Sequence, residues 1–179
     1  MLELRELSTS DETNVYNMLQ RISKIENEFT NEANGKTYEE YKKWLKVQHN
    51  WSMGRDLPVG YVKQWTFWLV ENNIPVGYGK IREKITEDSM QCGGNIGLSI
   101  DPLYRGKGYG NKLFELLLMK ARELNVFEIY STVEKYNYAS QKIHLKYKGE
   151  LLKEDEKRWY FYFDFRGNVN GKIALIKEK

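Results

Sequence analysis

The chain has 179 residues, enough for one domain of common size with its own hydrophobic core. Its 28 basic and 25 acidic residues leave a net charge of +3, too small and too evenly spread for a dedicated nucleic-acid-binding protein. A single cysteine excludes an internal disulfide framework and a cysteine-rich zinc site, so we expect no metal. No leader opens the chain and no apolar run reaches about 18 residues, so we expect a soluble cytoplasmic protein without membrane partners.

The N-terminal segment predicts one strand and one helix. Residues 2–7 alternate leucine with charged side chains, as in a half-buried strand. Thr9 and Glu12 then have the spacing of a capping box, in which two side chains satisfy backbone N–H groups at a helix start. Apolar residues recur behind it at helical spacing, so we expect a helix from Asp11 to Ile25.

A second capping box, Thr37 with Glu40, starts the next expected helix, which ends near Gln48. The stretch 49–62 has no clear period and contains a proline, two glycines and scattered aromatic residues. Such a composition predicts a loop that covers or lines a site.

Three buried strands are expected next. Residues 64–71 form a nearly continuous apolar and aromatic run, and a turn leads into 76–85, which predicts an antiparallel hairpin. Residues 95–101 alternate apolar with small or polar side chains and end at Pro102, which predicts the third strand.

The C-terminal part predicts two more helices and further strands. An apolar stripe indicates a helix over 109–124, a strand follows at 126–133, and Asn137 is the expected N-cap of a short helix. Aromatic residues alternate over 159–165, and the tail holds one more short apolar run. The pattern predicts a single domain over residues 1–179, an α/β (α+β) fold with a mixed, mostly antiparallel sheet flanked by helices.

The sequence RGKGYG, residues 105–110, lies between the third strand and its helix. The first N–H groups of a helix have no partner inside it, and the helix dipole adds partial positive charge there. A loop with few side chains lets a phosphate reach these donors, and Arg105 and Lys107 add charge. The loop therefore predicts a pyrophosphate site.

Two common phosphate motifs do not fit this loop. A Walker A loop ends in Gly-Lys-Ser or Gly-Lys-Thr, whereas Lys107 precedes Gly108 and Lys112 precedes Leu113. In a dinucleotide fingerprint the last glycine would stand where Asn111 or Leu113 stands here. Nucleotide hydrolysis and Rossmann-type binding are therefore not expected.

The loop instead fits R-x-x-G-x-G, with Arg105, Gly108 and Gly110 in the fixed places. Between a strand and a helix, this pattern resembles the acetyl-CoA loop of the GNAT superfamily, the Gcn5-related N-acetyltransferases. Residues 137–149 resemble the family's second signature, in which an asparagine, a small residue and an apolar residue precede a glycine. The likeness covers about residues 64–165. Within this range the chain resembles a bacterial subgroup of predicted acetyltransferases.

The resemblance implies acetyl-CoA as co-substrate and a GNAT-like acyltransferase fold. The pantetheine arm would add to the third strand like another strand, the loop amides would hold the pyrophosphate, and two polar residues of the last helix would face the arm. The implied cofactor-binding residues are Leu98, Ser99, Ile100, Arg105, Gly106, Lys107, Gly108, Tyr109, Gly110, Asn137 and Ser140.

Acetyl transfer to an amine requires two proton movements. The amine must lose a proton before it attacks, and the leaving thiolate must gain one. Many relatives donate the second proton from a tyrosine seven places after the asparagine, where His144 stands here, with Tyr147 as second candidate. His144 is equally compatible with a buried structural role. The strand before the loop carries no carboxylate, so Glu134 and Glu83 are the candidate bases.

We predict an N-acetyltransferase that acts on a primary amine of a small molecule or peptide. Two alternatives stay open: a catalytically weak CoA-binding regulatory module, and an interaction domain that binds no nucleotide. The acceptor would lie near residues 49–62, where Trp51 and Tyr61 could surround a small amine or a peptide end. Pairing of the tail after Phe165 with a second copy, giving a homodimer, is a further hypothesis.

Overall fold

The computed structural model describes residues 1–86 and 93–166. Its main sheet has the strand order β1-β4-β5-β6, and a second sheet has the order β7-β9-β8. The strands are β1 (Leu2–Glu6), β2 (Ile25–Glu26), β3 (Phe29–Thr30), β4 (Gln64–Glu71), β5 (Ile74–Arg82), β6 (Ile96–Ile100), β7 (Glu128–Glu134), β8 (Glu150–Glu154) and β9 (Arg158–Asp164). The helices are α1 (Thr13–Arg21), α2 (Tyr38–Ser52), the short 3₁₀ helix η1 (Pro102–Tyr104), α4 (Tyr109–Glu123) and α5 (Tyr138–Lys146).

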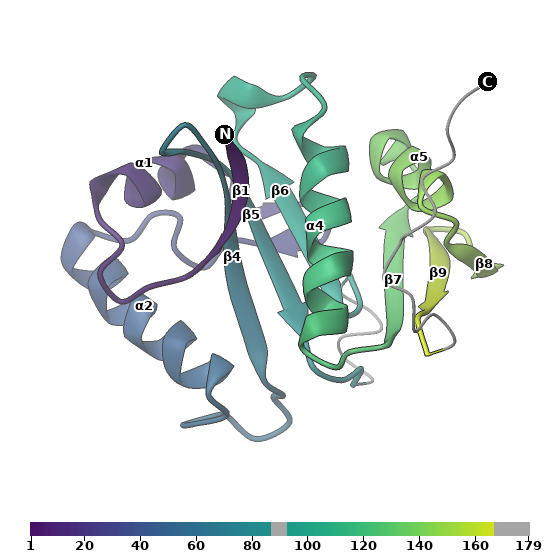
Figure 1. Ribbon diagram of the computed structural model, residues 1–179, viewed down its shortest axis with the longest axis horizontal. Helices are drawn as coiled ribbons and strands as arrows, with labels where there is room; N and C mark the ends of the chain where they lie inside the picture. The colour runs from purple at the N-terminus through teal and green to yellow at the C-terminus, as the bar shows by residue number, and fades with distance from the viewer. Residues whose placement is uncertain (87–92, 167–179) are drawn as a thin grey trace.

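Helices cover both faces of the four-stranded sheet (Figure 1). α1 and α2 pack on the face that presents Trp68 and Tyr78, whereas α4 packs on the face that presents Phe67 and Leu69. The strands alternate in this way because successive side chains of a strand point to opposite faces. The predicted α/β fold with flanking helices and a mostly antiparallel sheet is confirmed, but the sheet is divided into two.

The two sheets meet at one point in the described ranges. An isolated bridge pairs Gly94 with Ser131, and the Asn95 backbone N–H donates to the Tyr130 carbonyl at 2.7 Å. Beyond this junction, residues 96–100 of β6 pair with β5 on one side and with no described strand on the other. We call this second side the open edge of β6. Its backbone groups can bond a further partner, except that the Ile100 carbonyl already accepts from Arg105 Nε at 3.0 Å.

The first helix is shorter than predicted. α1 ends at Arg21, and the expected continuation to Ile25 is wrong. The Asn31 side chain donates to the carbonyl oxygens of Leu19 at 2.8 Å and Ile22 at 2.9 Å, which satisfies the last turn of the helix. The apolar spacing continues past Arg21, so the sequence pattern does not mark the end of the helix. The hydrogen bonds from Asn31 mark it.

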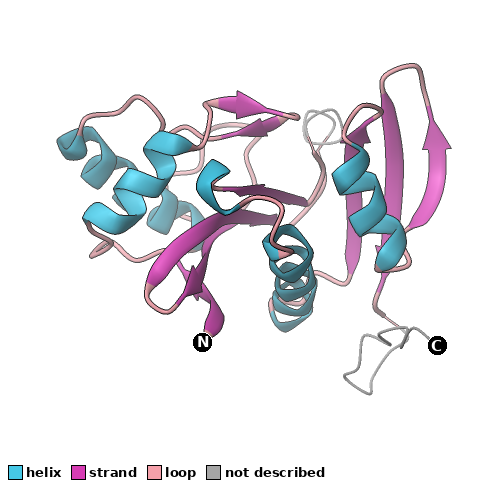
Figure 2. Cartoon of the chain, turned by 90° about the horizontal axis from the view of Figure 1, so that it is seen from above, coloured by secondary structure: helices cyan, strands magenta, loops and turns pink. Residues whose placement is uncertain are grey.

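The chain then forms the β2–β3 hairpin, which the sequence did not predict. Asn27 and Glu28 at its tip have φ angles of 47° and 63°, a left-handed conformation that suits a two-residue hairpin turn. The hairpin extends toward the three-stranded sheet (Figure 2). It therefore covers part of the face of β6 opposite α4.

The predicted capping boxes have different outcomes. At the start of α2, the Glu40 N–H donates to Thr37 Oγ1 at 3.3 Å and the Thr37 N–H donates to Glu40 Oε2 at 2.8 Å, so this box is confirmed. The box of Thr9 with Glu12 is wrong, because Glu12 is itself the N-cap and makes no side-chain capping bond. The neighbouring Asp11 carboxylate accepts the Ser8 N–H instead.

Two further boundaries differ from expectation. α2 continues past Gln48 to Ser52, so Trp51 lies on a helix and not in a loop. β8 was not predicted, because all five of its residues are exposed and no apolar alternation marks the strand.

The expected tail strand lies outside the described residues. In the described ranges no helix has the length and apolar character to cross a membrane.

Candidate active site

The glycine loop 105–110 connects β6 to α4 as predicted. Gly106 and Gly108 have φ angles of 75° and 84°, and Gly108 is the N-cap of α4. A Cβ atom at either glycine would meet nothing within 4 Å, so the space beside this backbone is open. The N–H groups of residues 106–108 donate to no acceptor within the described ranges, and the first turn of α4 adds further donors. This arrangement suits an anion such as a pyrophosphate.

The strand register shows which groups of β6 face its open edge. The Asp101 N–H donates to the Val76 carbonyl of the neighbouring strand at 3.0 Å, and such bonds recur at every second residue of an antiparallel pair. The backbone groups of Ser99 therefore bond within the sheet, whereas those of Leu98 and Ile100 point to the open edge. Two of the three predicted β6 residues thus have backbone groups that a pantetheine amide could reach.

Arg105 is already engaged in this structure. Its guanidinium forms a bidentate ion pair with Glu26 of β2, at 2.8 and 2.7 Å, and its Nε donates to the Ile100 carbonyl at 3.0 Å. The Glu26 carboxylate therefore offsets part of the positive charge expected at the loop. Lys107 lies with its Nζ 5.2 Å from the centre of the Tyr104 ring and supplies the second positive charge.

Side chains at both ends fix the loop. Asp101 is fully buried, accepts the Arg21 guanidinium at 2.6 to 3.1 Å and caps the following turn through the Leu103 N–H at 3.1 Å. At the other end, the Tyr109 hydroxyl donates to Glu71 of β4. Its phenol is thus directed at β4, so any contact of this residue with a bound anion would come from its backbone N–H.

His144 lies on α5, and its ring packs against aromatic residues of α4 and β9. The ring is 2% exposed and packs 4.5 Å from Phe114 between ring centres. Its Nδ1 lies 2.7 Å from the Ser140 carbonyl oxygen, which only accepts, so Nδ1 carries the proton and Nε2 accepts from Ser131 Oγ at 2.8 Å. Burial lowers the pKa of His144 to about 4, so the ring is neutral at pH 7. These contacts favour the structural alternative over proton donation.

The other polar candidates of this region are also engaged. The Tyr147 hydroxyl donates to the Asn111 carbonyl at 3.2 Å, and partial burial raises its pKa, so the phenol stays protonated at neutral pH. Asn137 Oδ1 accepts the Ser140 N–H at 3.2 Å, which confirms the predicted N-cap. Contact of these residues with CoA stays a prediction.

The two predicted bases lie at the ends of strands in different sheets. Glu83 follows β5 and forms an ion pair with Lys63 at 3.8 Å. Glu134 ends β7, where its carbonyl accepts the Asn137 N–H at 2.9 Å. A third carboxylate, Glu28 at the tip of the β2–β3 hairpin, was missed because the sequence placed this stretch just after a helix. It contacts Arg158 of β9.

A pocket of about 330 Å³ adjoins the segment predicted to receive the acceptor. Trp51 and Tyr61 line it with ring centres 5.3 Å apart, together with Glu32, Lys80 and Arg82. Lys80 is 2% exposed, donates to the Thr30 carbonyl at 2.8 Å and lies 3.5 Å from Glu32. Burial lowers the pKa of Lys80 to about 8. The pocket combines an aromatic wall with both signs of charge.

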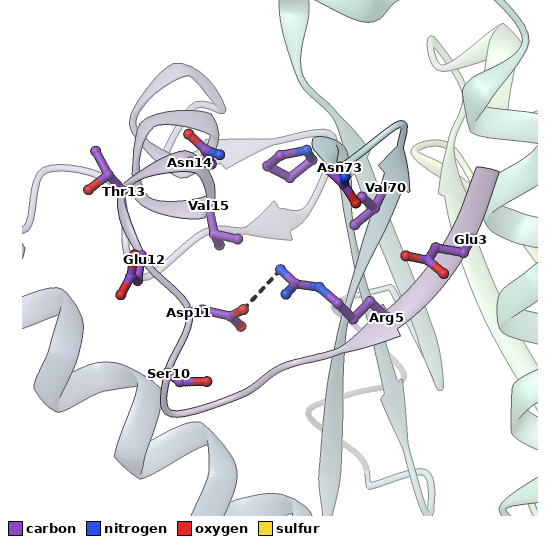
Figure 3. Close-up of a pocket in the computed structure, with 11 residues that line it drawn as sticks. Glu3, Arg5, Ser10, Asp11, Glu12, Thr13, Asn14, Val15, Val70 and Asn73 are labelled. Atoms are coloured by element: carbon purple, nitrogen blue, oxygen red, sulfur yellow. Dashed lines mark ion pairs between the residues drawn. The ribbon is translucent and has the colours of Figure 1, made fainter. Parts of the chain in front are cut away.

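A second pocket, of about 370 Å³, lies at the opposite edge of the main sheet (Figure 3). Arg5 of β1 and Asp11 face each other across it at 2.9 Å. Asp11 also accepts the Trp68 indole N–H at 2.7 Å, so its carboxylate joins the strands to the start of α1. Because β1 and β6 are opposite edges of the sheet, this pocket is not part of the candidate active site.

Solved structures with the same fold include several acetyltransferases. The ribosomal-protein-S5-alanine acetyltransferase of Vibrio fischeri has a TM-score of 0.69 at 17% identity, covering 96% of this chain and 95% of that one. The Campylobacter jejuni N-acetyltransferase PseH in complex with acetyl coenzyme A has a TM-score of 0.58 at 18% identity, covering 92% and 99%. An acetyltransferase from Salmonella typhimurium that modifies the N-terminal serine of ribosomal protein L7/L12 has a TM-score of 0.60 at 15% identity, covering 90% and 92%.

No curated protein matches the chain. The family model of the acetyltransferase (GNAT) family matches residues 19–149, a span that includes α2, the glycine loop and α5. This match covers more than half of the chain and confirms the resemblance found in the loop. The chain therefore belongs to the acetyltransferase (GNAT) family.

Proposed function

We propose that the protein transfers an acetyl group from acetyl-CoA to a primary amine of a small molecule or peptide. One observation carries the proposal: the loop 105–110 presents N–H groups that bond no acceptor among the described residues, directly after the open edge of β6. Membership of the GNAT family supports acetyl transfer, and a structure of similar fold is a complex with acetyl coenzyme A.

The residues present suit the two parts of CoA in different ways. The amides of residues 106–108 and the first turn of α4 would bind the pyrophosphate. Leu98 and Ile100, whose backbone groups face the open edge, would bond the pantetheine arm as a neighbouring strand does. The Ile100 carbonyl is now occupied by Arg105 Nε, so Arg105 would have to move for full pairing.

In the proposed reaction a neutral amine nitrogen attacks the thioester carbonyl carbon. The carbonyl oxygen becomes an oxyanion, which needs a hydrogen-bond donor at the open edge of β6. The carbon–sulfur bond then breaks, the amide product leaves and the thiolate takes up a proton. Because His144 has both ring nitrogens bonded, we assign it a structural role.

For the acceptor, we propose the pocket lined by Trp51 and Tyr61. Its rings offer apolar surface to the body of an amine, and Glu32 offers a carboxylate to a cationic group. Two structures of similar fold are named for acetylation of ribosomal proteins, so peptides with free N-termini belong in any acceptor panel.

The test is release of free CoA from acetyl-CoA with a panel of primary amines: peptides, amino acids, polyamines and aminoglycosides. We expect saturable turnover on at least one amine. Thermal unfolding adds a binding readout, because acetyl-CoA at 100 times its Kd should add about 2.7 kcal/mol of stability. A shift without turnover would support the regulatory module, and no shift at all would support the interaction domain.

A further inference from the structure

The β2–β3 hairpin brings a carboxylate to the place where the two sheets meet. Phe29 of the hairpin lies on β6, because a Cβ atom at Gly97 would be 3.1 Å from the Phe29 ring. Phe29 is 8% exposed and therefore anchors the hairpin on this face. The tip, with Glu28, then reaches past β6 toward the three-stranded sheet (Figure 2).

Glu28 makes two contacts on that sheet. One carboxylate oxygen pairs with Arg158 Nε of β9, and the other lies 3.4 Å from Thr132 Oγ1 of β7. Thr132 Oγ1 also accepts the Gly93 N–H at 3.0 Å, next to the bridge at Gly94. The Glu28 side chain is 13% exposed, so it is held near the junction and still reaches solvent.

The position of Glu28 relative to the glycine loop places it near the expected reaction centre. The loop follows Ile100 at one end of β6, and the junction at Gly94 precedes the other end. An acyl-pantetheine that runs along the open edge from a pyrophosphate on the loop would bring its thioester to the junction end. At about 3.4 Å per residue, β6 spans about 15 Å, which suits such an arm. The thioester would then lie near Glu28.

The hairpin's other carboxylate differs in availability. Both oxygens of Glu26 are bonded to the Arg105 guanidinium at 2.8 and 2.7 Å. In Glu28 one oxygen pairs with Arg158, whereas the other has only the long contact to Thr132 among the described residues. A carboxylate oxygen with a free lone pair can accept a proton from a nearby ammonium group, directly or through one water.

We propose that Glu28 is the group that accepts the proton of the acceptor amine, an inference that rests on the proposed acetyl transfer. The ammonium N–H gives its proton to Glu28 Oε2, the oxygen that does not pair with Arg158, and the freed nitrogen pair forms the bond to the thioester carbon. The thioester's carbon–sulfur bond breaks, sulfur leaves with its electron pair, and the second proton, which the new amide nitrogen loses, neutralises the thiolate. Arg158, the charged group that faces Glu28 from β9, holds the carboxylate in place.

The experiment compares two variants that break the same ion pair. Glu28→Gln removes the proton acceptor, whereas Arg158→Gln leaves it present. With the best primary amine of the panel at pH 7.5, we expect kcat/KM of Glu28→Gln to fall about 100-fold. For Arg158→Gln we expect a fall of about fivefold, because the carboxylate is still present but is held less firmly. Glu123→Gln, which removes an exposed charge of the α4 end, should match the wild type.

The pH profile separates catalysis from structure. A peptide α-amino group has a pKa of about 8 and a lysine side chain about 10.4, so raising the pH supplies the neutral amine without a base. The loss of kcat/KM in Glu28→Gln should become smaller as the pH rises past the pKa of the amine used. The Kd for CoA, measured by calorimetry, should stay unchanged. Equal deficits in both variants at every pH would overturn the role of Glu28. Wild-type protein that binds CoA but acetylates no amine would overturn the proposed function as well.

Discussion

The two ends of β6 use left-handed glycines for opposite purposes. At the loop end, Gly106 and Gly108 have φ angles of 75° and 84°, and a Cβ atom added to either would meet nothing within 4 Å. At the junction end, Gly94 has φ 79°, but a Cβ atom would lie 2.1 Å from the Tyr130 carbonyl oxygen. The first pair leaves open space beside the loop, whereas Gly94 lets two backbones of the protein touch.

This contrast indicates how the site is divided. The loop end is built from backbone donors and is open, so its properties follow from a few residues in sequence. The junction end is built from contacts among β6, β7 and the hairpin, and it is supported from behind by His144 through Ser131. Glycine variants at the loop end should therefore change CoA binding, and glycine variants at the junction should change stability.

The largest effect is expected at Gly94. Gly94→Ala places a methyl group against the Tyr130 backbone, which cannot rotate away, and it also strains a left-handed residue. Together these costs should lower the free energy of unfolding by about 4 kcal/mol. Gly93→Ala is the matched control, because φ there is 87° but nothing lies within 4 Å, so it should cost about 1 kcal/mol in urea unfolding. Similar losses in both would contradict the contact at Gly94.

His144 should make stability depend on pH. In the unfolded chain its pKa is near 6.5, whereas burial lowers it to about 4 in the fold, so protons bind the unfolded state first as the pH falls. The loss of stability begins near pH 6.5, reaches about 3 kcal/mol near pH 4 and is absent above pH 7.

The comparison is with His144→Gln, whose unfolding free energy should fall less between pH 7 and pH 4. Its kcat at pH 7.5 should stay close to the wild-type value, because the ring is not free to donate. The same pH slope in both proteins would contradict the buried neutral ring, and loss of kcat with an intact fold would restore His144 as proton donor.

Gly108→Val should weaken CoA binding and lower stability only by the strain of a side chain in a left-handed conformation. A side chain there occupies the space beside the loop amides, and the loss of two hydrogen bonds to a charged group raises Kd about 100-fold. The backbone strain itself costs about 1 to 2 kcal/mol. Gly35→Val is the control, since φ there is 81° with nothing within 4 Å, and it should leave the Kd measured by calorimetry unchanged.

The smallest effect is expected at Glu26. Glu26→Gln removes the charge that neutralises Arg105, so Arg105 can turn to the pyrophosphate and the Kd for CoA should fall about threefold at low salt. Raising the salt should reduce this gain, because the new attraction is electrostatic. Weaker binding in the variant would mean that Glu26 holds Arg105 in a useful position.

The sequence predicted the elements whose signals are local. The capping box of Thr37, the N-cap at Asn137 and the glycine loop all depend on residues within a few positions of one another, and the structure has each of them. The end of α1 was mispredicted because Asn31, beyond the helix, supplies the bonds that end it. The same error hid the hairpin and its two carboxylates.

By itself, the sequence determined the family, the order of the main elements and the glycine loop between β6 and α4. These depend on periodicity and on glycine conformations, which act over short distances along the chain. Only the tertiary structure decided that Arg105 pairs with Glu26, that His144 is buried and that Glu28 lies beside Thr132. Each of these features brings together side chains from different elements. Burial and charge pairing exist only after those elements have packed together.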